Sequence, residues 1–245
     1  MREIEFLSIK VHPLKRTEFL SIIKSGISNR EKIVQFGVNS ATINEIGINE
    51  NLKRAVNSAD LVSVDGMSVV WALRFLGYKA PERVATPDLA DDVITMAARE
   101  RFSVFLLGAK EAVVTLCREN MLNAYPELII AGYHNGHYQP DSEDRIVDMI
   151  NKADPDILLI GMSSSRKEIF AETHRHELNA RYVLGVGGYF DIIAGYTKRA
   201  PRWLQDIGME WLYRFIQEPR RMWPRYTIGI FKFFWLVIME KFKKK

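Results

Sequence analysis

One carboxylate stands where a catalytic base could work. Asp65 directly follows the apolar run LVSV and precedes Gly66. In parallel α/β sheets, ligands bind beyond the carboxyl ends of the strands, so a carboxylate at such an end faces the crevice. There it could take a proton from an attacking hydroxyl. An equal alternative is that Asp65 caps the helix expected to begin near Met67.

Other polar residues follow expected strands in the same way. Asn39 comes after the run IVQFGV and could bind a sugar hydroxyl or cap the next helix. Arg83 lies in PERVATPDL, ahead of a helix with Pro87 at its first position, and could hold a phosphate or be a solvated surface residue. Lys167 begins a helix, where a cation is unfavourable, so either an anionic ligand or plain solvation accounts for it.

The sequence lacks the motifs of several common kinds of binding site and active site. The segment GVGGYFD around Gly187 offers only G-x-G-G, not the dinucleotide-binding G-x-G-x-x-G. No serine-hydrolase elbow, HExxH or cysteine cluster occurs, and Asp91-Asp92 falls inside an expected helix. We therefore expect neither a cofactor nor a required metal. The single Cys117 lies in a helical stretch and is interpreted as an inert buried thiol of a cytosolic protein.

Alternating strands and helices must position these residues. The strands are expected at Ile33–Phe36, Leu61–Val64, Ser103–Leu107, Leu128–Gly132, Ile157–Ile160 and Tyr182–Val186, with a further one near Glu5–Ile9. The helices are expected at Thr17–Lys24, Ala41–Val56, Met67–Phe75, Asp88–Arg101, Glu111–Ala124, Ser142–Asn151 and Glu168–Leu178. This order predicts an α/β fold with a largely parallel, Rossmann-like sheet, in two sub-lobes that meet near Arg101.

The last 48 residues differ from the rest in charge and composition. Residues 198–245 hold twelve Lys/Arg, four Asp/Glu and four of the five tryptophans, whereas residues 1–197 are mildly acidic. Their longest apolar run, Thr227–Met239, is too short to span a bilayer and precedes the basic EKFKKK. We expect a core at 1–197 and a helical appendage at 198–245 that lies on the membrane surface; a core or dimer-interface helix is the alternative.

Three arginines of this appendage could converge on one ligand. Arg214, Arg221 and Arg225 are spaced by seven and four, which places them on one face of a continuous helix. Three guanidinium groups suit a diphosphate. Pro219 and Pro224 make a break in the helix expected, however, and a solvated basic face explains the spacing equally well.

Taken together, these motifs resemble a known family. The segments ADLVSVDGMSVVWALRFLG, PERVATPDL, GMSSSRKEIF and the run from Gly185 to Tyr226 are similar to the WecG/TagA/CpsF family of bacterial glycosyltransferases over roughly residues 4–226. The resemblance implies a Rossmann-like core whose C-terminal appendage closes the active site at the membrane. It also implies an inverting, metal-independent transfer of a hexose-type sugar from a UDP-sugar to a polyprenyl-diphosphate-linked sugar, at the cytoplasmic face of the cell membrane, in cell-surface polysaccharide synthesis.

The resemblance also implies residue roles. Asp65 would be the general base, and Asn39 and Arg83 would contact the donor. Residues of the strand-end segments, Lys167, Gly187 and Asp191, would lie near the sugar or nucleotide, and the appendage arginines would bind the diphosphate: Arg214, Arg221 and Arg225. The donor would be N-acetylmannosamine, a uronic acid or a glucose-like sugar linked to UDP.

The chain departs from the family pattern at three places. Gly37 stands where members often carry Thr, Thr86-Pro87 stands in a region that is usually Gly, and Lys167 replaces a Gln. One hypothesis is that Lys167 pairs with the carboxylate of a uronic acid donor.

A second functional class stays open. The chain could be a non-catalytic module that binds membranes or anionic polymers, with Asp65 as a helix cap. Nucleic-acid binding is not expected, because the body lacks interleaved basic and aromatic residues. A homo-oligomer is plausible, since an apolar tail without lipid must be covered.

Overall fold

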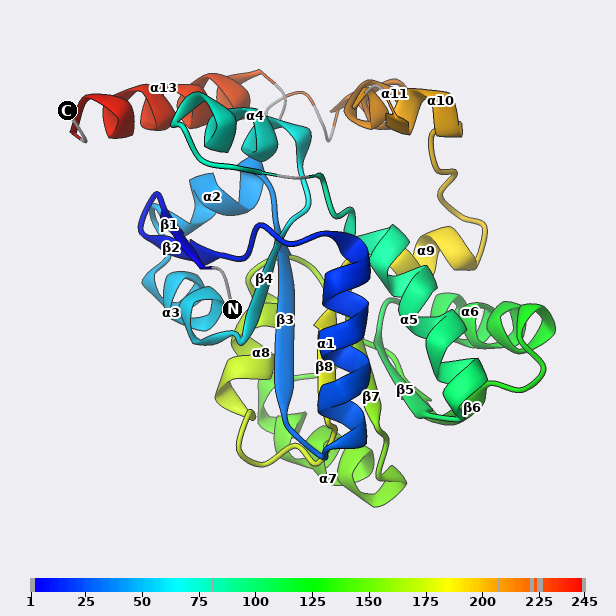
Figure 1. Cartoon of the computed structure of the whole chain (residues 1–245). Coiled ribbons are helices and arrows are strands. Elements are labelled where there is room, and N and C mark those ends of the chain that lie inside the picture. The colour runs from blue at the N-terminus through cyan, green and yellow to red at the C-terminus, as the bar shows by residue number, and fades with distance from the viewer. Residues whose placement is uncertain (1–2, 81, 207, 221–222, 224–226, 244–245) are drawn as a thin grey trace.

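The architecture is a six-stranded parallel sheet with helices on both faces. The computed structural model describes residues 3–80, 82–206, 208–220, 223 and 227–243. The sheet has the strand order β4-β3-β8-β7-β5-β6, as Figure 1 shows. Its strands are β3 (Ile33–Val38), β4 (Leu61–Val64), β5 (Ser103–Gly108), β6 (Ile129–His134), β7 (Ile157–Gly161) and β8 (Tyr182–Gly185). The expected α/β fold is confirmed.

Strand composition explains why this sheet is parallel and covered on both faces. Every residue of β4, β7 and β8 is buried, which matches their continuous apolar runs and differs from the alternation of a half-exposed strand. One face packs against α1 (Arg16–Ser28), α5 (Thr86–Glu100) and α6 (Glu111–Ala124). The other packs against α7 (Glu143–Ala153) and α8 (Arg166–Thr173).

The strand–helix series before and after Arg101 are two halves of this one sheet. Strand β3 of the first half pairs in parallel with β8 of the second, from Ile33 opposite Tyr182 to Phe36 opposite Gly185. The two expected sub-lobes therefore share a continuous sheet. Cys117 lies fully buried on α6, and burial raises the pKa of its thiol to about 12, as an inert thiol requires.

The N-terminal strand and two helices differ from expectation. Instead of one strand near Glu5–Ile9, the chain forms an antiparallel hairpin of β1 (Ile4–Phe6) and β2 (Ile9–Val11). The single helix expected at Ala41–Val56 is two helices, α2 (Ser40–Ile46) and α3 (Glu50–Ser58), and α8 ends at Thr173 instead of Leu178. By contrast, α4 (Met67–Phe75) and α6 have the expected bounds.

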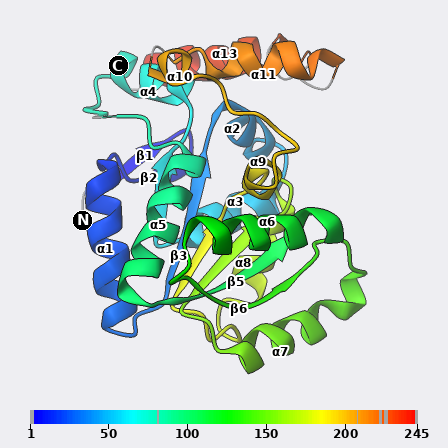
Figure 2. The ribbon, with the colours of Figure 1, turned by 90° about the vertical axis from the view of Figure 1, so that its right-hand side faces the viewer.

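The appendage lies across the end of the molecule toward which β3 and β4 run (Figure 1, Figure 2). Its described helices are α10 (Arg202–Asp206), α11 (Glu210–Gln217) and α13 (Ile228–Lys243). Helix α13 packs on α2, and its Phe233 and Val237 are buried in a cluster with Phe6 and residues of α2, α3 and α4. Among the described residues, no helix is both long enough and apolar enough to cross a bilayer.

Candidate functional site

Asp65 lies at the carboxyl end of β4 and is partly exposed. Its Oδ1 accepts a hydrogen bond from the backbone N–H of Thr86, the first residue of α5, at 2.9 Å. The N-cap of α4 is Gly66, so the alternative in which Asp65 caps α4 is wrong. The carboxylate instead satisfies a free N–H at the start of α5. The bond fixes the carboxylate through one oxygen, and no described residue hydrogen-bonds to its Oδ2.

Asn39 lies beside Asp65 at the same edge. It caps α2, with Oδ1 accepting from the N–H groups of Ala41 at 3.0 Å and Thr42 at 3.3 Å. A Cβ placed on Gly66 would lie 3.1 Å from the Asn39 Cβ, so the two strand ends are in close contact. Capping by Asn39 is confirmed. Its contact with a sugar stays a prediction.

Gly37 and Thr86, which both depart from the family pattern, face each other next to Asp65. A Cβ on Gly37 would lie 2.2 Å from the Thr86 Oγ1 and 3.2 Å from the Asp65 Cβ. The Thr86 hydroxyl therefore occupies the space that a side chain at position 37 would need. The absence of a side chain at Gly37 and the presence of one at Thr86 are sterically complementary, and the hydroxyl beside Asp65 comes from α5.

Replacing Gly37 by Ala is expected to lower the free energy of unfolding by about 1–3 kcal/mol, because the new methyl group overpacks this site. Removing the obstructing side chain in the double variant Gly37→Ala/Thr86→Ala should recover most of that loss. Thermal and urea unfolding of the four chains measures both effects. Additive losses in the double variant would show that the two positions are independent.

Arg83 is held by the appendage. Its Nη2 donates to Glu210 Oε2 at 3.1 Å, and the two side chains are only 14% and 9% exposed. Glu210 begins α11. A second appendage contact lies beside Asp65, because a Cβ on Gly208 would come within 2.8 Å of the Met67 Cγ at the start of α4. The appendage therefore lies against the segments that flank the candidate base.

The appendage arginines fall largely outside the described structure. The backbone of Arg214 is part of α11, while its side chain, Arg221 and Arg225 lie outside the described residues. Their binding of a diphosphate stays a prediction. Sequence reasoning missed Arg199, which joins the appendage to α5 by donating to Asp88 Oδ1 at 2.6 Å.

Lys167 is buried beside the carboxyl end of β8. Its ammonium group is bonded to Glu168 Oε1, and their side chains are 11% and 0% exposed. Its methylene groups pack over Gly185, where a Cβ would lie 3.1 Å from the Lys167 Cδ. The other carboxylate oxygen of Glu168 is buried without a hydrogen-bond partner in the described structure. The charge of Lys167 is thus compensated within the chain.

Changing Lys167 to Met is expected to destabilise the fold by about 3–5 kcal/mol, because Glu168 is left as a buried charge without its partner. The double variant Lys167→Met/Glu168→Gln removes both charges and should unfold much closer to the wild-type temperature. Differential scanning calorimetry compares the three chains. A single variant as stable as the wild type would show that this pair does not neutralise a buried charge.

The last strand end contributes Gly187 and Asp191. Gly187 has a φ of 56°, a left-handed conformation that favours glycine. Asp191 lies in α9 (Tyr189–Ile193), and its backbone oxygen accepts from the Thr197 N–H at 3.0 Å. Within the described structure, no hydrogen bond or ion pair links Asp191 to Asp65, Asn39 or Arg83. Their joint role in donor binding stays a prediction.

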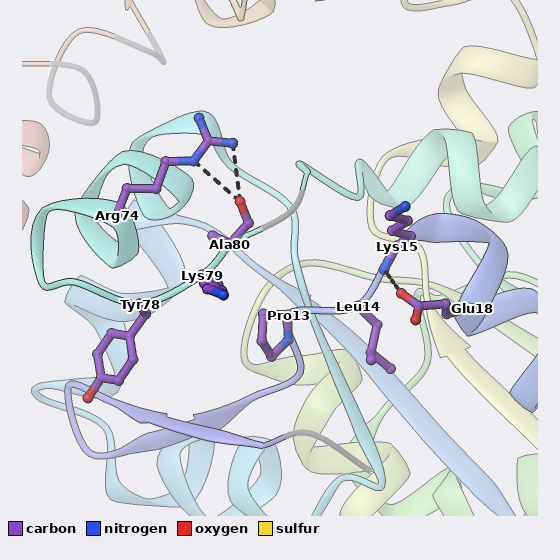
Figure 3. A pocket seen from close by; sticks show the side chains of 8 residues that line it. All are labelled: Pro13, Leu14, Lys15, Glu18, Arg74, Tyr78, Lys79 and Ala80. Carbon is purple, nitrogen blue, oxygen red and sulfur yellow. Dashed lines mark hydrogen bonds between the residues drawn. The ribbon is translucent and has the colours of Figure 1, made fainter.

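A surface hollow of about 560 Å³ lies apart from Asp65. Figure 3 shows its lining, which runs from the start of α1 to the loop after α4: Pro13, Leu14, Lys15, Glu18, Arg74, Tyr78, Lys79 and Ala80. Arg74 shapes one wall by donating twice to the Ala80 carbonyl oxygen, at 3.1 and 3.3 Å. None of the expected site residues that the structure describes lines this hollow, and we assign it no chemical role.

The site combines a fixed carboxylate, a helix-capping amide and a guanidinium held under a basic appendage. This set can accept a proton and bind an anionic group, which suits group transfer from a phosphorylated donor. Residues 4–245 match the family model "Glycosyl transferase WecG/TagA/CpsF family". One similar protein is the N-acetylglucosaminyldiphosphoundecaprenol N-acetyl-beta-D-mannosaminyltransferase of Bacillus subtilis, 30% identical over 78% of this chain and 73% of that protein. The chain is thus a member of the WecG/TagA/CpsF family of glycosyltransferases.

Proposed function

We propose that this protein is an inverting hexosyltransferase that moves a sugar from UDP to a polyprenyl-diphosphate-linked acceptor sugar. Family membership supports the reaction class, and the name of the Bacillus relative describes transfer of an N-acetylmannosaminyl group to a lipid-diphosphate sugar. The observation that carries the proposal is Asp65, a strand-end carboxylate fixed through Oδ1 beside the appendage.

The reaction is a single in-line displacement. The acceptor hydroxyl attacks the anomeric carbon and gives its proton to Asp65, and a new C–O bond forms there. The bond from that carbon to the diphosphate oxygen breaks on the opposite side, so the configuration inverts and the electron pair leaves with UDP. Arg83 and the N–H groups at helix starts stabilise the growing negative charge. Base catalysis of this kind contributes about 10²–10⁴-fold.

The buried pair of Lys167 and Glu168 bears on the donor sugar. Glu168 already neutralises the Lys167 ammonium group, so this lysine has little net charge with which to attract the carboxylate of a uronic acid. We therefore expect a neutral donor sugar. N-acetylmannosamine, which the name of the relative contains, is such a sugar. A preference of the enzyme for acidic UDP-sugars that Lys167→Gln abolishes would instead restore the uronic acid hypothesis.

A lipid-linked acceptor is reached at a membrane surface, and α13 has an exposed apolar face that could bind such a surface. Its exposed Phe231, Trp235, Ile238 and Phe242 recur at helical spacing, opposite the buried Phe233 and Val237. The exposed aromatic residues Trp71 and Phe75 of α4 lie nearby, since Lys241 of α13 donates to the Phe75 carbonyl oxygen at 2.8 Å. Aromatic residues rimmed by lysines suit anionic lipid headgroups, so we place the protein peripherally at the cytoplasmic membrane.

The test is UDP release from a panel of neutral and acidic UDP-sugars, with and without a lipid-diphosphate sugar acceptor and with a metal chelator present. Acceptor-dependent release from one neutral sugar supports the proposal. The alternative, a non-catalytic module for membranes or anionic polymers, predicts liposome binding but no release from any sugar. Release that stops on chelation would overturn metal independence alone.

A further inference from the structure

Arg83 depends on the appendage for its orientation. The guanidinium is nearly enclosed, and among the described residues it forms one ion pair, from Nη2 to Glu210 Oε2 at 3.1 Å. A buried guanidinium without a partner would be costly, so this contact fixes where the group lies. Within the described residues, no hydrogen bond is made by Arg83 Nε or Nη1, which leaves N–H groups to bind a ligand.

Glu210 is itself held from the other side. Its Oε1 lies 3.9 Å from Arg199 Nε, and Arg199 donates to Asp88 Oδ1 at 2.6 Å and to Gln205 Oε1 at 2.8 Å. Asp88 is in the first turn of α5, the turn that begins with the N–H held by Asp65. Glu210 is thus anchored to the same helix terminus that positions the candidate base.

We propose that Glu210 is a positioning residue that orients Arg83 toward the diphosphate of the nucleotide donor, so that docking of the appendage creates the donor site. One carboxylate oxygen occupies one edge of the guanidinium, and the remaining N–H groups meet the phosphate oxygens in the fork geometry that arginine favours. This inference rests on the proposed function. It differs from the expectation that arginines of the appendage bind the diphosphate directly, because here the appendage orients Arg83, which belongs to the core.

The test measures the affinity of full-length variants for UDP by titration calorimetry. Glu210→Ala should weaken UDP binding about tenfold or more, because a charge-assisted contact to phosphate loses its orientation. Glu210→Gln keeps an acceptor oxygen for Arg83 and should recover a large part of that affinity. If Glu210 instead competes with phosphate for Arg83, both variants bind UDP more tightly, and the inference is overturned.

A double-mutant cycle shows whether the effect passes through Arg83. Adding Glu210→Ala to Arg83→Gln should not weaken UDP binding beyond the single Arg83 variant, whereas additive losses contradict the inference. The matched control is Gln217→Ala, which removes a hydrogen bond from the same helix to the Lys198 carbonyl oxygen and should leave affinity within about twofold. Thermal unfolding checks each variant, and Glu210→Gln carries the test if Glu210→Ala is poorly folded.

Three further outcomes distinguish failure of this inference from failure of the proposed function. Binding of a short-chain lipid diphosphate should be unchanged by Glu210→Ala; a loss confined to that ligand would contradict the donor assignment. Tight UDP binding that no Glu210 variant alters would overturn this inference and leave the proposed function standing. Absence of UDP binding by the wild type would instead overturn the proposed UDP-sugar donor.

Discussion

Replacing Asp65 by Asn is expected to lower turnover by about 10²-fold or more, while UDP affinity stays within about twofold. Asparagine keeps an oxygen that accepts the Thr86 N–H, so the start of α5 remains satisfied. It lacks the basicity needed to take a proton from the acceptor hydroxyl. Asp65→Ala would confuse the result, because it also leaves that N–H without its partner, at a cost of about 1–3 kcal/mol. Steady-state turnover and UDP calorimetry measure the two quantities.

The matched control for this variant is Asp156→Asn. Asp156 also accepts a backbone N–H through its carboxylate, from Ser103 at 2.8 Å, but it directly precedes β7 and so lies at the amino-terminal end of the parallel strands, opposite to the end that carries Asp65. Its replacement should leave turnover unchanged within about twofold if only a strand-end carboxylate takes part in the chemistry. Near-normal turnover of Asp65→Asn would remove Asp65 from the role of base. Equal losses in both variants would point to a structural effect.

Removing two exposed aromatic residues of α13 should abolish most membrane binding. The double variant Phe231→Ser/Trp235→Ser is expected to bind anionic vesicles at least about 100-fold more weakly, since burying each such side chain contributes about 1.5–3 kcal/mol. Its stability should be close to wild type, because both side chains are largely exposed, at 77% and 63%. Vesicle co-sedimentation and thermal unfolding give the two readouts.

A neighbouring residue on the same helix provides the opposite control. Phe233 is fully buried and contacts Phe6 with a centroid distance of 6.4 Å. Phe233→Ala should lower the free energy of unfolding by about 3–5 kcal/mol. Unchanged vesicle binding by the double variant, together with a shift of the chain from dimer to monomer in sedimentation, would show that this face covers a second copy of the protein instead of lipid.

The core of the fold was predictable because its signals are local and strong. Continuous runs such as ILLIG in β7 belong to strands buried on both faces, and the segments between them are long enough for one or two helices. The hairpin at the N-terminus was not predictable in this way. Its two-residue turn, Leu7 and Ser8, has φ values of 48° and 66°, which usually call for Asn-Gly. The break between α2 and α3 did have a signal, since Asn49 caps α3 by accepting from Leu52 N–H at 3.1 Å.

The site was only partly predictable, because much of it depends on contacts distant in sequence. Asp65 and Asn39 were found from their places after strands. Contacts such as Glu210 with Arg83 and Thr86 against Gly37 join segments that no local pattern connects. The packing of the appendage on the core also depends on contacts distant in sequence.

Phe233 of the appendage is buried against the core, so removing residues 198–245 would expose apolar surface. Point variants therefore test the role of the appendage more cleanly than truncation.

A crystal structure of the full-length protein with UDP and a short-chain lipid-diphosphate sugar tests the proposed roles of Asp65 and Arg83 most directly. We expect the nucleotide diphosphate to contact Arg83 and the acceptor hydroxyl to lie within hydrogen-bond distance of Asp65 Oδ2, beneath the appendage. UDP bound away from the ends of β3 and β4, for example in the hollow lined by Lys15 and Lys79, would contradict it.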